Sequence, residues 1–350
     1  MAPKFLVFRF PKRTSFDDLV ECEEATPEVG RHDVPIKIRA VALNSRDLQV
    51  ATGQYPFPVT DNLIPCSDGA GDIVAVGEGV GNLTQGDRVA ISFNTRYFYG
   101  AQKSWLTCQG GYIDGPLAEY VVRPAASVVK VPTSARQSYA ELASLVCAGV
   151  TAWNGLFGNV PPKPGQNVLV QGTGGVALTA LAIAKAAGAT TIVTSSSDAK
   201  LAAVKAKYSP DHCINYTEYP AYPAWADRAL ELVGEQGIDH IIKIGGVGTI
   251  EQTLRAIAYG GVISVIGYLA QYDAAKMPNV PLLALGKAAV VRGILIGPKY
   301  MLEDLVTFVD RVRLQLPVEK VFRFTREEVV AAYKELALGE GIGKICITLS

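Results

Sequence analysis

The chain has 350 residues, 49% hydrophobic and 19% charged, which is enough to bury the cores of about two domains of ordinary size. Its 33 basic side chains balance 33 acidic ones, so a nucleic-acid partner is not expected. No apolar run approaches the roughly 18 residues of a membrane span, and residues 1–15 lack the apolar core of a signal peptide. Six scattered cysteines without a C-x-x-C pair are typical of reduced thiols, so we expect a cytoplasmic protein.

The first third of the chain predicts a compact, mostly antiparallel β-barrel. Residues 34–42 alternate apolar and polar side chains, as a half-buried strand does, and residues 71–77 and 87–92 show a similar pattern. Glycine-containing turns at 79–81 and 85–87 separate these predicted strands.

The middle of the chain alternates apolar strands with helical segments, which predicts a parallel, doubly wound sheet. We expect strands at 168–170, 191–194, 240–244, 262–266 and 290–296, with helices at 199–208, 225–235 and 250–258. After Pro298 we expect a helix at 301–313, a strand at 321–324, a helix at 326–338 and a final strand at 344–349.

A glycine turn joins the first of these strands to a predicted helix at 179–187. Gly172, Gly174 and Ala177 fit the pattern G-x-G-x-x-G/A, which lets a pyrophosphate approach the backbone. The N-terminus of the following helix offers unpaired N–H groups and a partial positive charge to that group. We therefore expect a dinucleotide to bind at Gly172, Thr173, Gly174, Gly175 and Val176; the alternative is a purely structural turn.

Several further motifs accompany this turn: ALNSRD at 42–47, PCSDGAG at 65–71, LTQGDRVA at 83–90, LAEYV at 117–121, CAGVTAW at 147–153 and GKICI at 343–347. With them the chain resembles the medium-chain dehydrogenase/reductase superfamily over its full length, in the zinc-independent, quinone-oxidoreductase-like or alcohol dehydrogenase-like branch. The resemblance implies an α/β protein in which a GroES-like β-barrel catalytic domain (1–130 and 299–350) is split around a Rossmann doubly wound parallel-sheet domain (131–298). It places the nicotinamide between the two domains. It also implies a homodimer formed through the last Rossmann strand, 290–296, whose apolar edge would otherwise invite aggregation.

The same comparison argues against a metal. Zinc-bearing relatives hold catalytic zinc with a Cys, a His and a second Cys, but here Asn44 and Ser67 stand at the first two positions and only Cys147 matches. An amide and a hydroxyl are poor substitutes for thiolate and imidazole. The four-cysteine cluster of a structural zinc is also missing, because the corresponding segment contains only Cys108. No metal is therefore expected, and Cys147 is expected to be a packed thiol.

The second Rossmann strand ends in serines where NAD enzymes usually carry Asp or Glu for the ribose hydroxyls. The hydroxyls of Ser195, Ser196 and Ser197 and the ammonium of Lys200 favour a 2′-phosphate, which a carboxylate would repel. Tyr216 matches a phosphate-binding position of NADP-using relatives. We therefore expect NADPH/NADP+ rather than NADH, with a solvated serine-rich loop as the alternative and Asp198 as a helix N-cap. The resemblance implies further cofactor contacts at Asn44, Thr151, Gly245, Gly267, Tyr268 and Lys344.

Without a Lewis acid, reduction of an activated alkene or a quinone is easier than oxidation of an alcohol. Tyr55 is the first candidate for a proton or hydrogen-bond donor, since a phenol with a pKa near ~10 is protonated at neutral pH. Alternatively, Tyr55 only lines a pocket. Asn44 is expected to contact the nicotinamide ribose or a substrate oxygen, and Asp47 to position neighbouring groups. Arg46 and Asp47 are expected on an extended segment, pointing in opposite directions. Asp68 is expected in a turn, with a role as an acid or base as the alternative.

The expected substrate is a small molecule with a conjugated carbonyl or a quinone. The aromatic segment at 93–112 could line its pocket, form the core of a lobe or make a subunit contact. Two other functions stay open: a metal-free alcohol dehydrogenase or carbonyl reductase, and an NADPH-binding structural or sensor protein without turnover.

Overall fold

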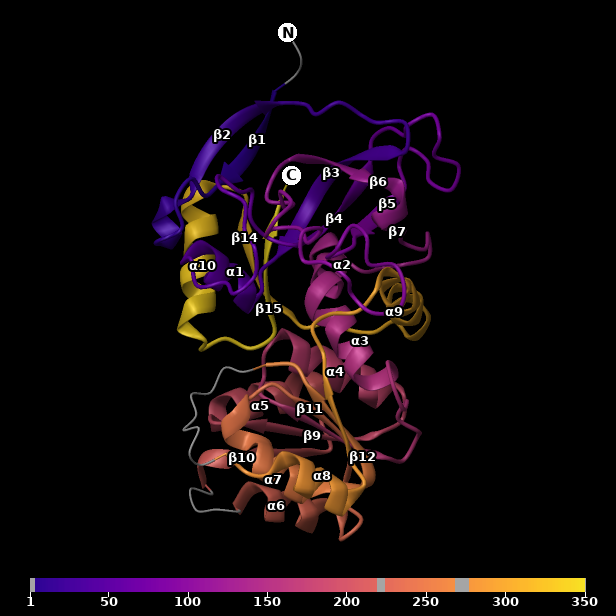
Figure 1. Ribbon diagram of the computed structural model, residues 1–350, viewed down its shortest axis with the longest axis vertical. Coiled ribbons are helices and arrows are strands. Elements are labelled where there is room, and N and C mark those ends of the chain that lie inside the picture. The colour runs from indigo at the N-terminus through magenta and orange to yellow at the C-terminus, as the bar shows by residue number, and fades with distance from the viewer. Residues whose placement is uncertain (1–3, 219–223, 268–276, 350) are drawn as a thin grey trace. The chain divides into compact units, whose positions relative to one another are not determined.

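The computed structural model describes residues 4–218, 224–267 and 277–349. They belong to two compact units, of which unit 1 is Met1–Val150 with Pro298–Ser350 and unit 2 is Thr151–Gly297 (Figure 1). Residues 131–150, which the sequence analysis assigned to the dinucleotide-binding domain, thus belong to unit 1. Within them, α2 (Tyr139–Ser144) packs on strands of the unit 1 sheet.

Unit 1 is built on a seven-stranded sheet in which every pair except β14–β15 is antiparallel. Its order is β14 (Val318–Arg323), β15 (Lys344–Thr348), β3 (Asp33–Ala42), β4 (Asp68–Ile73), β5 (Arg88–Ile91) and β7 (Val128–Lys130), with β6 (Tyr120–Pro124) paired to β3. A separate hairpin joins β1 (Lys4–Arg9) and β2 (Val20–Ala25). The strands predicted at 34–42, 71–77 and 87–92 are confirmed as β3, β4 and β5, with β4 shifted toward the N-terminus.

The helices of unit 1 are α1 (Ser45–Ala51), α2, α9 (Lys299–Val312) and α10 (Arg326–Leu338), with 3-10 turns at Phe16–Asp18 and Ala125–Ser127. The core contains the inward side chains of β3, such as Ile36 and Ile38, together with Tyr333 of α10, all fully buried. The C-terminal segment therefore completes the core that the N-terminal strands begin.

Unit 2 contains a six-stranded parallel sheet. Its order is β10 (His212–Asn215), β9 (Thr190–Ser195), β8 (Asn167–Gln171), β11 (Ile238–Lys243), β12 (Ile257–Val265) and β13 (Val290–Gly293). In chain order this is 3-2-1-4-5-6, the Rossmann arrangement, in which ligands bind where the strand order reverses, between β8 and β11. Val168, Leu169 and Val170 are fully buried, as expected for a strand covered on both faces.

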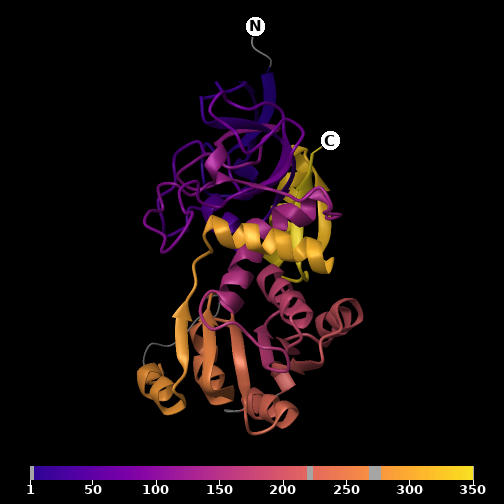
Figure 2. The same ribbon diagram turned by 90° about the vertical axis from the view of Figure 1, so that its right-hand side faces the viewer.

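Two rows of helices cover this sheet on opposite faces (Figures 1 and 2). One row is α4 (Gly175–Ala186) and α5 (Asp198–Tyr208); the other is α6 (Ala224–Val233), α7 (Ile250–Ala256) and α8 (Val280–Lys287). The sequence analysis predicted neither β10 nor α8. β10 is only four residues long and half of them are polar, and α8 carries a proline in its first turn, where the missing N–H costs nothing.

One apolar helical stretch, Tyr139–Phe157, consists of α2, a π-helical turn at Leu145–Gly149 and α3 (Val150–Phe157). Its 19 residues are long and apolar enough to cross a membrane, so the expectation that no apolar run approaches that length was wrong. However, 78% of the stretch is buried inside the protein, as in the core helix of a folded domain. Its length and composition are therefore weak evidence for a membrane span.

Candidate active site

The glycine turn after β8 leaves its backbone open to a ligand. Gly172 has a φ of +86°, a conformation that favours glycine, and a Cβ built on Gly172 or Gly174 would meet no atom within 4 Å. Gly174 caps α4 without a side-chain hydrogen bond, and Gly175 and Val176 form its first turn, where N–H groups lack intrahelical acceptors. Thr173 lies buried between the two glycines. The geometry of this turn fits a pyrophosphate.

The carboxyl ends of β8 and β11 are joined at the reversal of strand order. The backbone N–H of Gly245, two residues beyond β11, donates to Oε1 of Gln171, the last residue of β8, over 3.3 Å. Gly267 follows the neighbouring strand β12, and its N–H donates to the Lys243 carbonyl over 3.4 Å. The turn, Gly245 and Gly267 therefore lie at one edge of the sheet, where a doubly wound fold binds its ligand.

The serine-rich loop follows β9 at the same edge. Ser195 ends the strand and is buried, Ser196 is exposed, and Ser197 caps α5 by accepting a hydrogen bond from the Lys200 backbone N–H over 3.3 Å. The expectation that Asp198 would be the N-cap was wrong. Asp198 is the first helical residue, and its carboxylate accepts a 2.8 Å hydrogen bond from the Asn215 amide.

The remaining predicted cofactor residues are distributed over both units. Tyr216 follows β10 and is 44% exposed, whereas Thr151 is buried on α3. Tyr268 lies outside the described residues. Asn44 and Lys344 belong to unit 1, where they meet each other: Lys344 Nζ donates to Asn44 Oδ1 over 2.7 Å.

Arg46 and Asp47 lie on helix α1 and not on the extended segment that we expected. The helix begins after Asn44, whose backbone N–H donates to Oδ2 of Asp47 over 2.8 Å. This is the capping bond in which a carboxylate at the third helical position returns to the N-cap residue. Both Arg46 and Asp47 are buried, and Nη1 of Arg46 lies 3.4 Å from Oδ1 of Asp47.

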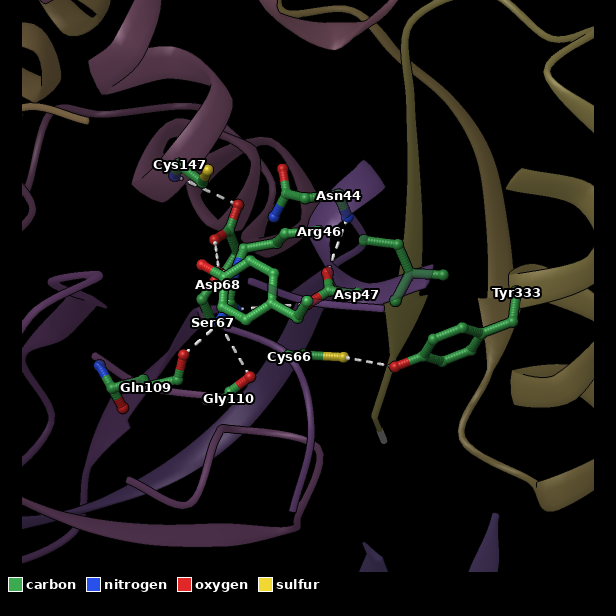
Figure 3. A network of polar contacts seen from close by, with 12 residues as sticks. Asn44, Arg46, Asp47, Cys66, Ser67, Asp68, Gln109, Gly110, Cys147 and Tyr333 are labelled. Carbon is green, nitrogen blue, oxygen red and sulfur yellow. Dashed lines mark hydrogen bonds and ion pairs between the residues drawn. The ribbon is translucent and has the colours of Figure 1, made fainter. Parts of the chain in front are cut away.

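The Arg46 guanidinium is held from several sides (Figure 3). It donates to the carbonyl oxygens of Gln109 over 3.2 Å and Gly110 over 2.9 Å. Its Cζ lies 4.9 Å from the ring centroids of both Tyr55 and Phe93, within the range of a cation–π contact. Arg46 is thus a fixed cation between two aromatic rings.

The Tyr55 hydroxyl is next to this cation and accepts a 3.3 Å hydrogen bond from Arg46 Nε. Burial raises the pKa of Tyr55, and the charge and hydrogen bond of Arg46 oppose that rise without cancelling it. The phenol therefore stays protonated at neutral pH. Its ring contacts Phe57 edge-on at 5.4 Å, and Phe57 stacks on Trp105 at 3.7 Å, so a row of aromatic rings extends from Tyr55.

Asp68 was expected in a turn, but it is the first residue of β4 and is fully buried. Its Oδ1 accepts a 2.6 Å hydrogen bond from Ser67 Oγ, and its Oδ2 accepts one of 3.2 Å from the Cys147 backbone N–H (Figure 3). Lys344 Nζ lies 3.8 Å from the same Oδ2. Burial raises the pKa of Asp68, and Lys344, Ser67 and Asn44 each lower it.

Unit 1 therefore holds a buried charge cluster of two acids and two bases: Asp47, Asp68, Arg46 and Lys344. Burial raises the pKa of Asp47 to about 6, with Arg46 opposing and the negative charge of Asp68 adding to the rise. Sequence reasoning missed this cluster because Arg46 and Asp68 were interpreted separately. Its signal was the presence of charged residues in the two family motifs at 42–47 and 65–71, since a charge that becomes buried requires a partner.

The residues present do not fit a zinc ion of the kind that zinc-bearing relatives hold. Over the described ranges, no group of three His, Cys, Asp or Glu side chains is arranged to hold a metal. Asn44 and Ser67, which stand with Cys147 at the ligand positions, offer only an amide and a hydroxyl, and neither is a good zinc ligand. A zinc-free reaction remains a prediction.

Two family models match the chain: "Alcohol dehydrogenase GroES-like domain" over residues 30–133 and "Zinc-binding dehydrogenase" over residues 175–311. The zinc-type alcohol dehydrogenase-like protein C1773.06c of Schizosaccharomyces pombe is 39% identical over 344 residues, 96% of each chain. The solved structure of a protein from Sinorhizobium meliloti 1021, assigned as an alcohol dehydrogenase, is also 39% identical, with a TM-score of 0.87 over 100% of both chains. Human quinone oxidoreductase is 29% identical over 244 residues, 69% of this chain and 67% of its own.

These matches confirm the predicted fold class, a GroES-like domain combined with a Rossmann parallel sheet. The extent of the similarity leaves the family in no doubt. The chain belongs to the medium-chain dehydrogenase/reductase superfamily, and it is an oxidoreductase of a family that works with a nicotinamide cofactor.

Proposed function

We propose that this protein is a zinc-independent, NADPH-dependent reductase that adds hydride to an activated alkene, such as an enone or enoyl compound, or to a quinone. The observation that carries the proposal is the Tyr55 phenol, held protonated beside the Arg46 cation in a site whose residues do not fit zinc. A phenol in this state can donate a hydrogen bond or a proton without a metal.

Bound NADPH would supply the hydride, and the protein's residues manage the charge that follows. When hydride forms a bond to the β-carbon of an enone, the π electron pair moves to the carbonyl oxygen, which then needs hydrogen-bond donors. Tyr55 O–H can give its proton to the resulting enolate, and solvent restores the phenol. The row of rings from Tyr55 through Phe57 to Trp105 offers apolar aromatic contacts suited to a conjugated substrate.

The experiment that tests the function is steady-state consumption of NADPH with panels of enones, quinones and aldehydes. We expect turnover of enones or quinones at a rate that chelators and added zinc leave unchanged. If only aldehydes react, the chain is an alcohol dehydrogenase or carbonyl reductase, a candidate that the names of its relatives favour. Such an enzyme is metal-free if zinc leaves the rate unchanged, and a rate raised by zinc would also refute the zinc-independent chemistry. If NADPH binds but no compound is turned over, the protein is an NADPH-binding structural or sensor protein.

The preference for NADPH is expected to depend on Ser195, the last residue of β9. Ser195→Asp should shift the ratio of kcat/KM values toward NADH by about ten- to a hundredfold, because a carboxylate repels a 2′-phosphate and accepts hydrogen bonds from ribose hydroxyls. Kinetics with both cofactors measure the shift. Ala206→Asp, an exposed position near the end of α5, is the control and should change neither value. An unchanged ratio in Ser195→Asp would count against the predicted phosphate site.

The homodimer predicted from the sequence is also proposed here. Strand β13 ends the order of the unit 2 sheet, and apolar side chains on and beside it are exposed: Leu282 61%, Leu285 78%, Val291 36% and Leu295 64%. An unpaired apolar edge is suited to the same edge of a second copy. Light scattering at micromolar concentration should give a dimer mass, and Leu295→Glu should give a monomer. Leu338→Glu, at an equally exposed leucine of unit 1, should stay dimeric; a monomeric parent protein would refute the proposal.

A further inference from the structure

The two polar atoms of the Asn44 side-chain amide, Oδ1 and Nδ2, differ in their hydrogen bonds. Its Oδ1 accepts the 2.7 Å hydrogen bond from Lys344 Nζ. Its Nδ2, which carries two N–H donors, is buried and has no hydrogen-bond partner among the described residues. The amide also faces the Asp68 carboxylate and lowers its pKa as a hydrogen-bond donor does, although the two atoms lie outside ordinary hydrogen-bond geometry. Nδ2 carries two N–H groups, so at least one of them has no acceptor; because buried donors are rarely left unpaired, that N–H points to a ligand atom.

Lys344, in contrast, has its donors engaged within the protein. Its side chain is 3% exposed, and its ammonium donates to the Leu43 carbonyl and to Asn44 Oδ1 and faces Asp68 at 3.8 Å. Two hydrogen bonds and one ion pair therefore hold the ammonium within unit 1. The sequence analysis assigned Lys344 to cofactor binding, but the contacts of its ammonium point to a different role.

We propose that Lys344 is a positioning residue that orients and polarises the Asn44 amide, so that Asn44 Nδ2 donates to the substrate oxygen that gains negative charge. The bond from the ammonium holds Oδ1 toward Lys344, which directs the buried Nδ2 away from that ammonium. A cation on Oδ1 draws electron density from the amide, so its N–H groups become stronger donors. Asp68, fixed by Ser67 and by the Cys147 backbone, holds the ammonium in place.

The contacts of Asn44, Lys344 and Asp68 offer a way to stabilise a negatively charged substrate oxygen without zinc. Asn44, Ser67 and Cys147 stand at the positions where zinc-bearing relatives carry their ligands. Here Asn44 binds an ammonium, while Ser67 and the Cys147 backbone bind the carboxylate that faces it. Lys344 then supplies the fixed positive charge, and it acts on the substrate oxygen by polarising the Asn44 amide that donates to this oxygen. The inference rests on the proposed function insofar as it requires a substrate whose oxygen becomes negative.

The test uses Lys344→Met in the full-length protein, with any carbonyl substrate that the parent protein reduces. We expect kcat to fall by roughly ten- to a hundredfold, the loss of one charge-assisted hydrogen bond, while the dissociation constant of NADPH, measured by its fluorescence, stays unchanged. Asn44→Ala should lose a similar factor, and the double variant should lose no more than either single variant, because the two residues act as one. Lys320→Met on the neighbouring strand β14, which removes a partly exposed ion pair with Glu335 of α10, is the control and should retain full activity.

Two further variants separate this role from a loss of folding. Lys344→Met/Asp68→Asn removes both charges of the pair, leaves no buried charge unpaired, and should lose the same factor in kcat. Lys344→Ala should regain activity when ethylammonium is added, which a merely structural defect would not. A raised NADPH dissociation constant with unchanged kcat, or losses that multiply in the Asn44/Lys344 double variant, would overturn the inference. If the parent protein reduces only aldehydes, the proposed function fails, yet the same comparison can be made on an aldehyde, whose oxygen also gains charge.

Discussion

Tyr55→Phe is expected to lower kcat by about 10²–10⁴-fold at neutral pH, the range typical of removing a general acid. The ring is retained, so its contacts with Arg46 and Phe57 persist and only the hydroxyl is lost. Because burial keeps the pKa of Tyr55 raised, the loss should be the same from pH 6 to pH 8, where the phenol of the parent protein stays protonated. Steady-state kinetics across this range measure both the size of the loss and its pH dependence.

Tyr120→Phe provides the matched control for this variant. Tyr120 is also partly buried in unit 1, where its ring meets Phe5 edge-on, but it lies on β6 and not in the buried charge cluster. It should retain the parent kcat. If Tyr55→Phe keeps full activity while NADPH still binds, Tyr55 only lines the pocket, and the proton comes from another group or from water.

The elements that the sequence predicted correctly are those with a strong local pattern. The strands of unit 2 that are continuous runs of Val, Ile and Leu, and the glycine turn after β8, carry their signal within about ten residues. β10 lacks such a run, because only Ile214 and Asn215 are buried in it and its two other residues are half exposed. A strand that depends on its neighbour β9 for pairing leaves little trace in its own composition.

The error at Arg46 and Asp47 had a local signal that was overlooked. Asn44 and Asp47 are three residues apart, the spacing of a helix N-cap residue and its returning carboxylate, and they do open α1. The link between Asn44 and Lys344, by contrast, spans 300 positions of the chain and arises because β15 pairs with β3. No pattern in either segment alone could predict that contact, so the candidate site emerged only when the C-terminal strand was placed beside the N-terminal one.

Arg46→Met should lower the free energy of unfolding by roughly 3–5 kcal/mol, a loss that is typical when one partner of a buried ion pair is removed. The variant keeps much of the apolar volume between Tyr55 and Phe93, but it leaves Asp47 without its cation and two carbonyl oxygens without their donor. The midpoint of urea unfolding measures the loss. Arg39→Met is the control: its ion pair with Asp72 is partly exposed, and its removal should cost at most about 1 kcal/mol.

The pH dependence of this loss tests its electrostatic origin. The pKa of Asp47 is raised to about 6 in the folded protein from its ordinary value of 3.8, so its contribution to stability is greatest below the ordinary value and is lost as the pH rises through about 6. Without Arg46 the pKa of Asp47 rises further. The free energy of unfolding of the variant then continues to fall above pH 6, where that of the parent protein no longer changes through Asp47. The stability gap between Arg46→Met and the parent should therefore widen from pH 5 to pH 8. Arg46→Met/Asp47→Asn, which leaves no charge unpaired, should recover part of the loss at pH 8, whereas a gap independent of pH would mean that Arg46 acts through its carbonyl and ring contacts alone.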